Sequence, residues 1–325
     1  MHSRFAVKAA GLALSAAALT QTVPALAATP ASGLTHVRIA DHFDLATGQQ
    51  PENIALEPHG AIDLNMAVAR QVVRLYPNGR QQVLAQLPLP ADGGVHTPML
   101  GFPLLTGLVR ADDGTLYFLY ATGTSDLTGL WRLRPGGKPE RITALPANSL
   151  PNGLGLDPVR GEFYSADSAL STVWRMPLSG GSATAWASGP ELAPEGTLGA
   201  NGLKVHRGAV WVTNLSLGTI IRIPIRRHGA AGSFETRATG LTSIDDFAFV
   251  PHSDRIIATL DSQNKVAIVD PDGSSTIALT SEDGLENPTS VAVRGDTVYI
   301  ASAAWILRKD PNLVIARLRQ RLSQP

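Results

Sequence analysis

The 325-residue sequence contains no cysteine and has no net charge, because its 27 basic residues balance its 27 acidic residues. The lack of cysteine excludes a disulfide scaffold, a thiolate metal site and a cysteine nucleophile. The charge balance gives no attraction toward nucleic acid, so we expect no nucleic-acid partner. Also missing are the Gly-x-Ser-x-Gly elbow, His-Glu-x-x-His, a Walker loop and a dinucleotide-binding glycine motif. Serine hydrolase, zinc protease, nucleotidase and Rossmann dehydrogenase therefore have no support.

Long apolar runs are missing too, apart from one near the N-terminus. Arg4 and Lys8 come before an apolar stretch, Ala9–Leu19. Ala25–Ala27 then supplies the small residues of a cleavage site. The stretch is too short to span a bilayer comfortably, although an uncleaved membrane anchor is the alternative. We expect residues 1–28 to be a signal peptide and the mature protein to be secreted or periplasmic, free of the membrane.

Chain-breaking residues are abundant, with 31 glycines and 23 prolines, which favours many short strands and turns. The mature chain also repeats itself. Asn152-Gly-Leu-Gly-Leu-Asp opens one unit and Asn201-Gly-Leu-Lys-Val opens the next, each followed by a strand rich in aromatic or β-branched residues. The units can be aligned on the residue two places before the leading aliphatic residue of their first strand. The residues in this column are Glu52, Thr106, Asn152, Asn201, Asp245 and Thr289. Their successive spacings are 54, 46, 49, 44 and 44 residues.

A repeat of about 40–50 residues that holds four strands is typical of a β-propeller blade. Six units therefore predict an all-β fold, a six-bladed β-propeller, formed by residues 29–325 as a single domain. The last unit supplies only three strands, 289–293, 297–302 and 313–318, while a spare strand lies at 35–40. We expect this N-terminal strand to pair with the last blade and close the ring, which hides an open edge. The alternative is an N-terminal extension with a C-terminal helix.

The aligned column carries the candidate chemistry, because the first strand of each blade runs beside the central channel. Glu52, Asn152, Asn201 and Asp245 would then point into one mouth of the channel. Two carboxylates and two amide oxygens form a hard ligand set that suits Ca²⁺ better than Mg²⁺. Alternatively, the asparagines are hairpin-turn residues, Glu52 is a solvated loop acid and Asp245 is a local cap. Asp246 competes with Asp245, but the column phase favours Asp245.

Three further residues are candidates for the substrate pocket. Thr106 and Thr289 occupy the two remaining column positions and would line the site. His96 lies in an insertion at about residues 88–103, which would fold over the channel mouth and could bring a proton-transfer group with it. A second polar column, Asn65, Asp167, Asn214 and Asp261, follows the second strands and is interpreted as strand-ending residues.

The sequence resembles the gluconolactonase/senescence-marker-protein superfamily of six-bladed propellers over about residues 35–318. It is also similar to diisopropyl-fluorophosphatase, paraoxonase and strictosidine synthase-like proteins. The phrases that carry the resemblance are Pro51-Glu-Asn-Ile-Ala-Leu, Pro151-Asn-Gly-Leu-Gly-Leu-Asp, Ala200-Asn-Gly-Leu-Lys-Val and Asp245-Asp-Phe-Ala-Phe. The usual first-blade Glu-Gly-Pro reads Glu52-Asn-Ile here, and no match to the family's sugar-binding arginine is found.

The resemblance implies that Glu52, Asn152, Asn201 and Asp245 hold one catalytic Ca²⁺, with a second, structural ion also compatible. It implies a calcium-dependent hydrolase of a lactone or related ester, of the gluconolactonase or phosphotriesterase type, with Asp245 as nucleophile or general base. With the signal peptide, we expect a secreted protein that works as a monomer on a small molecule. Two alternatives stay open: a non-catalytic propeller that binds a small molecule or protein, and a bond-forming enzyme of the strictosidine synthase kind.

Overall fold

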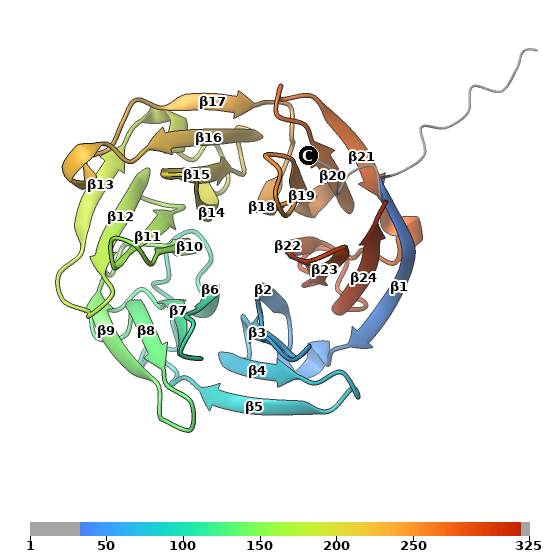
Figure 1. Ribbon diagram of the computed structural model, residues 1–325. Coiled ribbons are helices and arrows are strands. Elements are labelled where there is room, and N and C mark those ends of the chain that lie inside the picture. The colour runs from blue at the N-terminus through green and yellow to red at the C-terminus, as the bar shows by residue number, and fades with distance from the viewer. Residues whose placement is uncertain (1–32, 320–325) are drawn as a thin grey trace, which may run out of the picture. The chain divides into compact units, whose positions relative to one another are not determined.

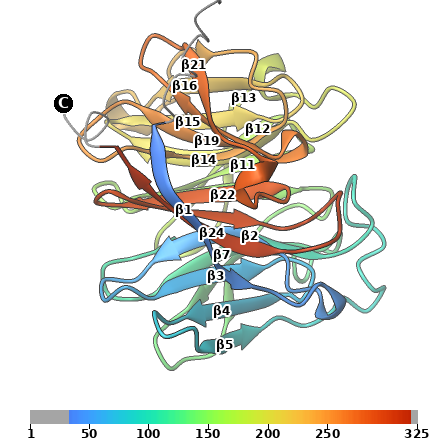
Figure 2. The same ribbon diagram turned by 90° about the vertical axis from the view of Figure 1, so that its right-hand side faces the viewer.

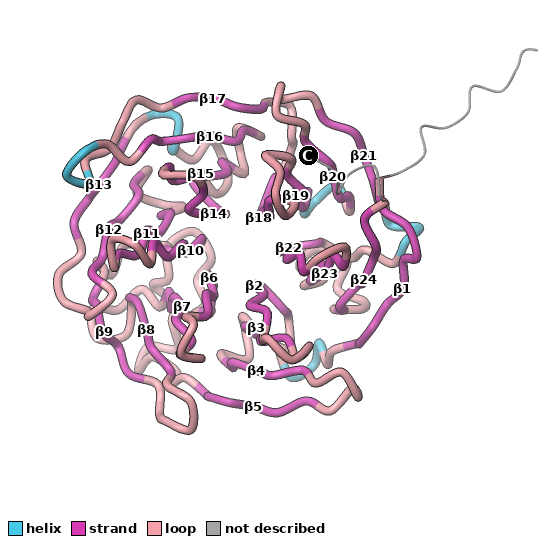
Figure 3. The backbone as a smooth tube through the Cα atoms, viewed as in Figure 1, coloured by secondary structure: helices cyan, strands magenta, loops and turns pink. Residues whose placement is uncertain are grey.

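A computed structural model describes residues 33–319, which form 24 strands in six four-stranded antiparallel sheets. The sheets stand as blades around a central axis, with one strand of each blade beside the channel (Figure 1). Helical structure is limited to short 3₁₀ turns in the connections between strands (Figure 3), namely η1 (Leu45–Thr47), η2 (Pro190–Leu192), η3 (Arg227–Gly229), η4 (Asp261–Gln263) and η5 (Ser281–Asp283). The predicted all-β six-bladed propeller is confirmed. The predicted signal peptide, residues 1–28, lies outside the described residues.

Five blades follow the chain in simple order from the inner to the outer strand. Blade 1 is β2 (Pro51–Leu56), β3 (Ile62–Met66), β4 (Gln71–Leu75) and β5 (Gln81–Gln86). Blade 2 is β6 (Leu104–Arg110), β7 (Leu116–Ala121), β8 (Gly129–Leu133) and β9 (Glu140–Ala144), and blade 3 is β10 (Pro151–Asp157), β11 (Glu162–Asp167), β12 (Thr172–Pro177) and β13 (Thr184–Ser188). Blade 4 is β14 (Ala200–His206), β15 (Ala209–Asn214), β16 (Thr219–Pro224) and β17 (Glu235–Ala238), and blade 5 is β18 (Ile244–Phe249), β19 (Ile256–Leu260), β20 (Lys265–Val269) and β21 (Ser275–Leu279).

Blade 6 combines the two ends of the described chain. Its strands are β22 (Pro288–Arg294), β23 (Thr297–Ser302), β24 (Asn312–Leu318) and, at the rim, β1 (Leu34–His42). β1 pairs antiparallel with β24, from Leu34 opposite Leu318 to His42 opposite Asn312. Figure 2 shows β1 crossing the side of the ring next to β24. The predicted closure by the N-terminal strand is therefore confirmed.

The strand sequences reflect the position of each strand within its blade. Central strands such as β7 and β15 are buried along their whole length, because blades on both sides cover their two faces. Such strands carry nearly continuous apolar and aromatic residues rather than an alternating pattern. The outer strands β5 and β9 face solvent and are correspondingly polar.

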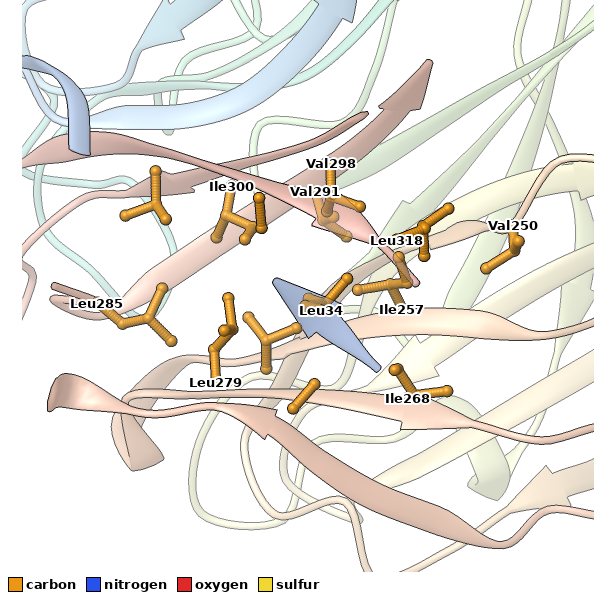
Figure 4. Close-up of a cluster of buried hydrophobic side chains, with 14 residues drawn as sticks. Leu34, Val250, Ile257, Ile268, Leu279, Leu285, Val291, Val298, Ile300 and Leu318 are labelled. Carbon is orange, nitrogen blue, oxygen red and sulfur yellow. The ribbon is translucent and has the colours of Figure 1, made fainter. Parts of the chain in front are cut away.

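The core consists of apolar layers between neighbouring blades. One such layer joins blades 5 and 6 (Figure 4), where Leu34 of β1 packs with Ile257, Ile268, Val298 and other buried aliphatic side chains. Leu34 is only 1% exposed, so the closing strand contributes to the core as well as to the sheet. Among residues 33–319, no helix combines the length and hydropathy needed to cross a membrane.

Candidate metal and catalytic site

A β-bulge marks the aligned column in every blade. In each blade the register between the first two strands shifts at the column residue, for example between Pro151 and Leu154 or between Ile244 and Phe247. A bulge turns its extra residue out of the regular alternation of the strand. The repeated phase in the sequence therefore corresponds to a repeated backbone irregularity at the same point of each inner strand.

The glycines that follow Asn152 and Asn201 serve close packing between blades rather than a hairpin turn. A Cβ placed on Gly153 would lie 2.3 Å from the carbonyl oxygen of Asn201, and one on Gly202 would lie 2.6 Å from that of Asp245. These distances are too short for any side chain, so each glycine lets the next inner strand approach. The alternative interpretation of Asn-Gly as a hairpin signal does not apply to either pair, because both lie within inner strands.

One cavity of about 210 Å³ collects the oxygen-bearing column residues. Glu52, Asn152, Asn201 and Asp245 all line it, joined by Asp261 at the start of η4. The first four side chains belong to β2, β10, β14 and β18, so four different blades contribute. Each of these four residues is at most 7% exposed. The structure thus brings the four predicted ligands to one place.

Hydrogen bonds from neighbouring groups hold these side chains in position. Trp305 donates its indole N–H to Oε2 of Glu52 at 3.1 Å, and Asn201 Nδ2 donates to Oδ1 of Asp245 at 3.0 Å. The Oδ1 atom of Asn201 lies 3.5 Å from Ser168 Oγ. With its amide nitrogen engaged by Asp245, Asn201 presents an oxygen rather than a donor as its remaining polar atom.

Burial and mutual repulsion perturb the carboxyl groups of the cavity. Burial raises the pKa of Glu52 from its usual 4.5 to about 8, against the opposing hydrogen bond from Trp305. Burial also raises the pKa of Asp245 well above its usual value, and the charge of Glu52 adds to the rise. Burial brings the pKa of Asp261 to about 7. Three carboxyl groups are therefore gathered where a positive charge would stabilise their ionised forms.

The donor set fits a hard cation. Oδ1 of Asp261 is buried and has no hydrogen-bond partner within residues 33–319, which leaves an acceptor without a donor at the cavity. Histidine, cysteine, aspartate and glutamate side chains alone form no metal-binding group of three or more in the described part of the chain. A cation here would therefore depend on the amide oxygens of Asn152 and Asn201 as well as on the carboxylates. Such mixed oxygen coordination is what Ca²⁺ accepts in proteins.

The neighbouring acid, Asp246, is engaged elsewhere. Its carboxylate accepts hydrogen bonds from Lys204 Nζ and Ser290 Oγ, both at 2.7 Å, and it does not line the cavity. The same bulge that directs Asp245 to the cavity directs Asp246 toward Lys204. Lys204 belongs to the opposite mouth of the channel, where a wider hollow of about 750 Å³ is lined largely by aliphatic residues of all six inner strands.

The three predicted pocket residues do not line the cavity. Thr106 and Thr289 are buried and donate their hydroxyls, each at 2.8 Å, to the carbonyl oxygens of Pro151 and Pro51 in adjacent blades. His96 has a side chain that is 75% exposed and contacts Asp92 at 2.7 Å. The insertion does reach the cavity, but through Leu100 and Phe102.

Several lining residues are not predicted from the sequence. Asp261 belongs to the second polar column, which the sequence presents as strand-ending residues, and Trp305 follows no pattern in the sequence. The remaining wall is apolar and is made of Leu100, Phe102, Leu104, Leu150, Leu198 and Leu215. Most of these residues lie just before or after a strand, where they follow no strand periodicity.

No protein-family model matches the chain, and no curated protein sequence matches it. The chain is, however, similar to solved structures. One is a calcium-binding protein, regucalcin, from Agrobacterium tumefaciens, with 14% sequence identity and a TM-score of 0.64; the match covers 87% of this chain and 93% of that chain. A gluconolactonase from Xanthomonas campestris has 14% identity and a TM-score of 0.62 over 90% and 99% of the two chains.

A third similar structure carries a different activity in its name. Virginiamycin B lyase from Staphylococcus aureus has 13% identity and a TM-score of 0.59 over 87% of this chain and 99% of that one. These likenesses confirm the resemblance to gluconolactonase-like propellers at the level of the fold. Because propellers host different reactions, the activity has to be argued from the site.

Proposed function

We propose that this chain is an exported, calcium-dependent hydrolase of lactones or related esters. The observation that carries the proposal is the cavity in which Glu52, Asn152, Asn201, Asp245 and Asp261 present oxygen atoms from several blades. No lysine, arginine or histidine is among its described lining residues, so a bound cation is the natural counter-charge for the carboxylates. Two of the structural neighbours, by name a calcium-binding protein and a gluconolactonase, support the choice.

A bound calcium ion would act as a Lewis acid that polarises the ester carbonyl and stabilises the negative charge developing on its oxygen. Glu52, Asn152, Asn201 and Asp245 would hold it, and the unpartnered oxygen of Asp261 makes that residue a fifth candidate. The hydrogen bond from Trp305 fixes the orientation of Glu52, and that from Asn201 fixes Asp245.

Asp245 has two possible roles in the bond-breaking step. As a base, it takes a proton from a water molecule whose oxygen bonds to the carbonyl carbon; the ring carbon–oxygen bond breaks and the proton passes to the ring oxygen, giving a hydroxy acid. As a nucleophile, Asp245 bonds to the carbonyl carbon while the ring carbon–oxygen bond breaks and the ring oxygen takes a proton from water. A water molecule then attacks the Asp245 carboxyl carbon of the resulting anhydride, which releases the hydroxy acid and regenerates the carboxylate. A single turnover in ¹⁸O-labelled water distinguishes them, because only the nucleophilic route places label in the Asp245 carboxylate.

The proposal is tested by measuring hydrolysis of lactones and aryl esters with calcium, with EDTA, and after calcium is restored. We expect EDTA to abolish turnover and calcium to restore it. Asp245→Asn should lower kcat by about a thousandfold, in the range of a lost general base. The matched control is Asp157→Asn, which removes a buried carboxylate at the other end of β10, where it pairs with Arg160 at 2.8 Å.

Two results would replace the proposal by another function. Calcium binding by calorimetry without any turnover would indicate a non-catalytic binding propeller. Hydrolysis that is unaffected by EDTA and by Asp245→Asn would remove both calcium and Asp245 from the reaction and leave a metal-independent hydrolase.

A further inference from the structure

The lining of the cavity has a polar part, here called the floor and formed by Glu52, Asn152, Asn201, Asp245 and Asp261, and an apolar part, here called the wall. Apart from the five oxygen-bearing residues, its lining consists of six leucine and phenylalanine residues together with Trp305. The indole N–H of Trp305 is already used by Glu52. The described wall therefore offers no free side-chain hydrogen-bonding group, and the polar side chains available to a substrate are those of the five oxygen-bearing residues.

The wall is a packed structure rather than a chance grouping of exposed residues. Leu104 and Leu150 are fully buried members of one hydrophobic cluster, and Leu100, Phe102 and Leu198 pack against it. The rings of Phe102 and Trp305 lie 6.0 Å apart between centroids. Contacts between residues that are far apart in the sequence therefore keep the wall in place, including the part supplied by the insertion at residues 88–103.

The volume limits the size of the reacting group. A cavity of about 210 Å³ corresponds to roughly seven waters, at about 30 Å³ per water. This is room for a five- or six-membered ring with a short substituent. A sugar lactone of that size carries a hydroxyl on nearly every carbon, and each hydroxyl turned to the leucine wall would lose its hydrogen bonds to water without gaining a partner.

We infer that the substrate is a lactone whose ring carries an alkyl substituent rather than hydroxyl groups. This inference rests on the proposed hydrolase function. The ester group would face Glu52, Asn152, Asn201 and Asp245 of the floor, and the alkyl chain would pack on Leu198, Leu100 and Phe102. The insertion thereby acts as a specificity-determining segment, although its histidine is exposed and does not line the cavity.

The test compares γ-hexalactone and δ-octalactone with glucono-δ-lactone, in calcium and after subtraction of spontaneous hydrolysis. We expect kcat/KM for the alkyl lactones to exceed that for the sugar lactone by about tenfold or more, as one or two unpaired buried hydroxyls require. Leu198→Asn, which places an amide in the wall, should narrow this ratio. Leu89→Asn makes the same change at a leucine that is 54% exposed and does not line the cavity, and should leave the ratio unchanged.

A binding measurement keeps this inference separate from the proposed function. Calorimetry with 2-butylcyclopentanone and with 1,5-anhydroglucitol asks which ring the cavity accepts, whether or not any lactone is hydrolysed. Preference for the ketone without lactone turnover would support the apolar site and overturn the hydrolase. Efficient hydrolysis of glucono-δ-lactone, equal to or better than that of the alkyl lactones, would overturn the apolar substrate and leave the hydrolase standing. Stronger binding of the polyol would also overturn it.

Discussion

The buried carboxyl of Glu52 should make the calcium-free protein less stable as the pH rises. Burial raises its pKa from 4.5 to about 8 in the folded protein, so between these values the folded state binds a proton that the unfolded chain has released. The resulting stabilisation is fully present below pH 4.5 and is lost as the pH rises through 8. The sign is opposite to that of an ion-paired carboxylate.

The size of the effect follows from the difference between the two pKa values. From pH 5 to pH 8 the free energy of unfolding should fall by about 3–4 kcal/mol on account of Glu52 alone, at about 1.4 kcal/mol per pH unit for one proton. Since Glu52 is only 6% exposed, solvent screening does not reduce this figure greatly. Asp245 and Asp261 have raised pKa values as well and should steepen the fall.

Urea unfolding in EDTA at several pH values between 5 and 8 measures this dependence. Glu52→Gln should flatten it, because the variant has no proton to lose and its neutral side chain also relieves the repulsion that raises the pKa of Asp245. Glu282→Gln, at an exposed glutamate of η5, serves as the control and should behave as the parent does. The reasoning is refuted if the stability of the parent is constant over this range, or if Glu52→Gln loses stability as steeply as the parent.

Three further substitutions probe the scaffold around the site. Gly153→Ala should destabilise the protein by about 1–3 kcal/mol in urea unfolding, because its Cβ would meet the Asn201 carbonyl at 2.3 Å. Trp305→Phe should weaken calcium binding in calorimetry by about tenfold, since Glu52 loses a 3.1 Å hydrogen bond to its charged form. Leu34→Ala should lower the free energy of unfolding by about 2–5 kcal/mol in urea unfolding, because the substitution leaves a cavity beneath the closing strand β1.

Each of these three substitutions has a control substitution at a site that lacks the contact being tested. Gly137→Ala should cost less than Gly153→Ala, because neither glycine has a positive φ and the Cβ added at Gly137 would come no closer than 3.2 Å to the Arg134 carbonyl oxygen. Trp186→Phe removes an indole hydrogen bond to Gly229 and should leave calcium affinity unchanged. Val159→Ala, at a side chain that is 91% exposed, should leave stability unchanged. Equal effects within any pair would contradict the explanation given for it.

The repeat made most of the fold predictable from the sequence. The column containing Asn152 and Asn201 recurs because every blade needs a bulge at the same point of its inner strand, so its phase survives in a single sequence. Closure was predictable for a similar reason: the last unit lacked one strand, and the segment around Val37 supplied a strand without a blade.

The rest of the site could not be predicted because it depends on contacts that follow no repeat. Trp305 lies in the connection between β23 and β24, and its contact with Glu52 joins residues 253 positions apart. Asp261 occupies a strand end in phase with Asp167, but Asp167 is satisfied by Ser149, Leu150 and Trp174 whereas Oδ1 of Asp261 is not. Two residues at the same phase thus differ only in their partners, which a sequence does not display.

The two column threonines show how the same position can serve the site without entering it. The hydroxyl of Thr289 binds the carbonyl that precedes Glu52, and that of Thr106 binds the carbonyl that precedes Asn152. Each bond fixes the backbone at the bulge from which the next ligand side chain extends. The threonines of blades 2 and 6 therefore hold the backbone in position, whereas Glu52 of blade 1 and Asn152 of blade 3 present oxygen atoms to the cavity. An acidic residue in place of either threonine would add a negative charge to a channel in which Glu52 and Asp245 already repel each other.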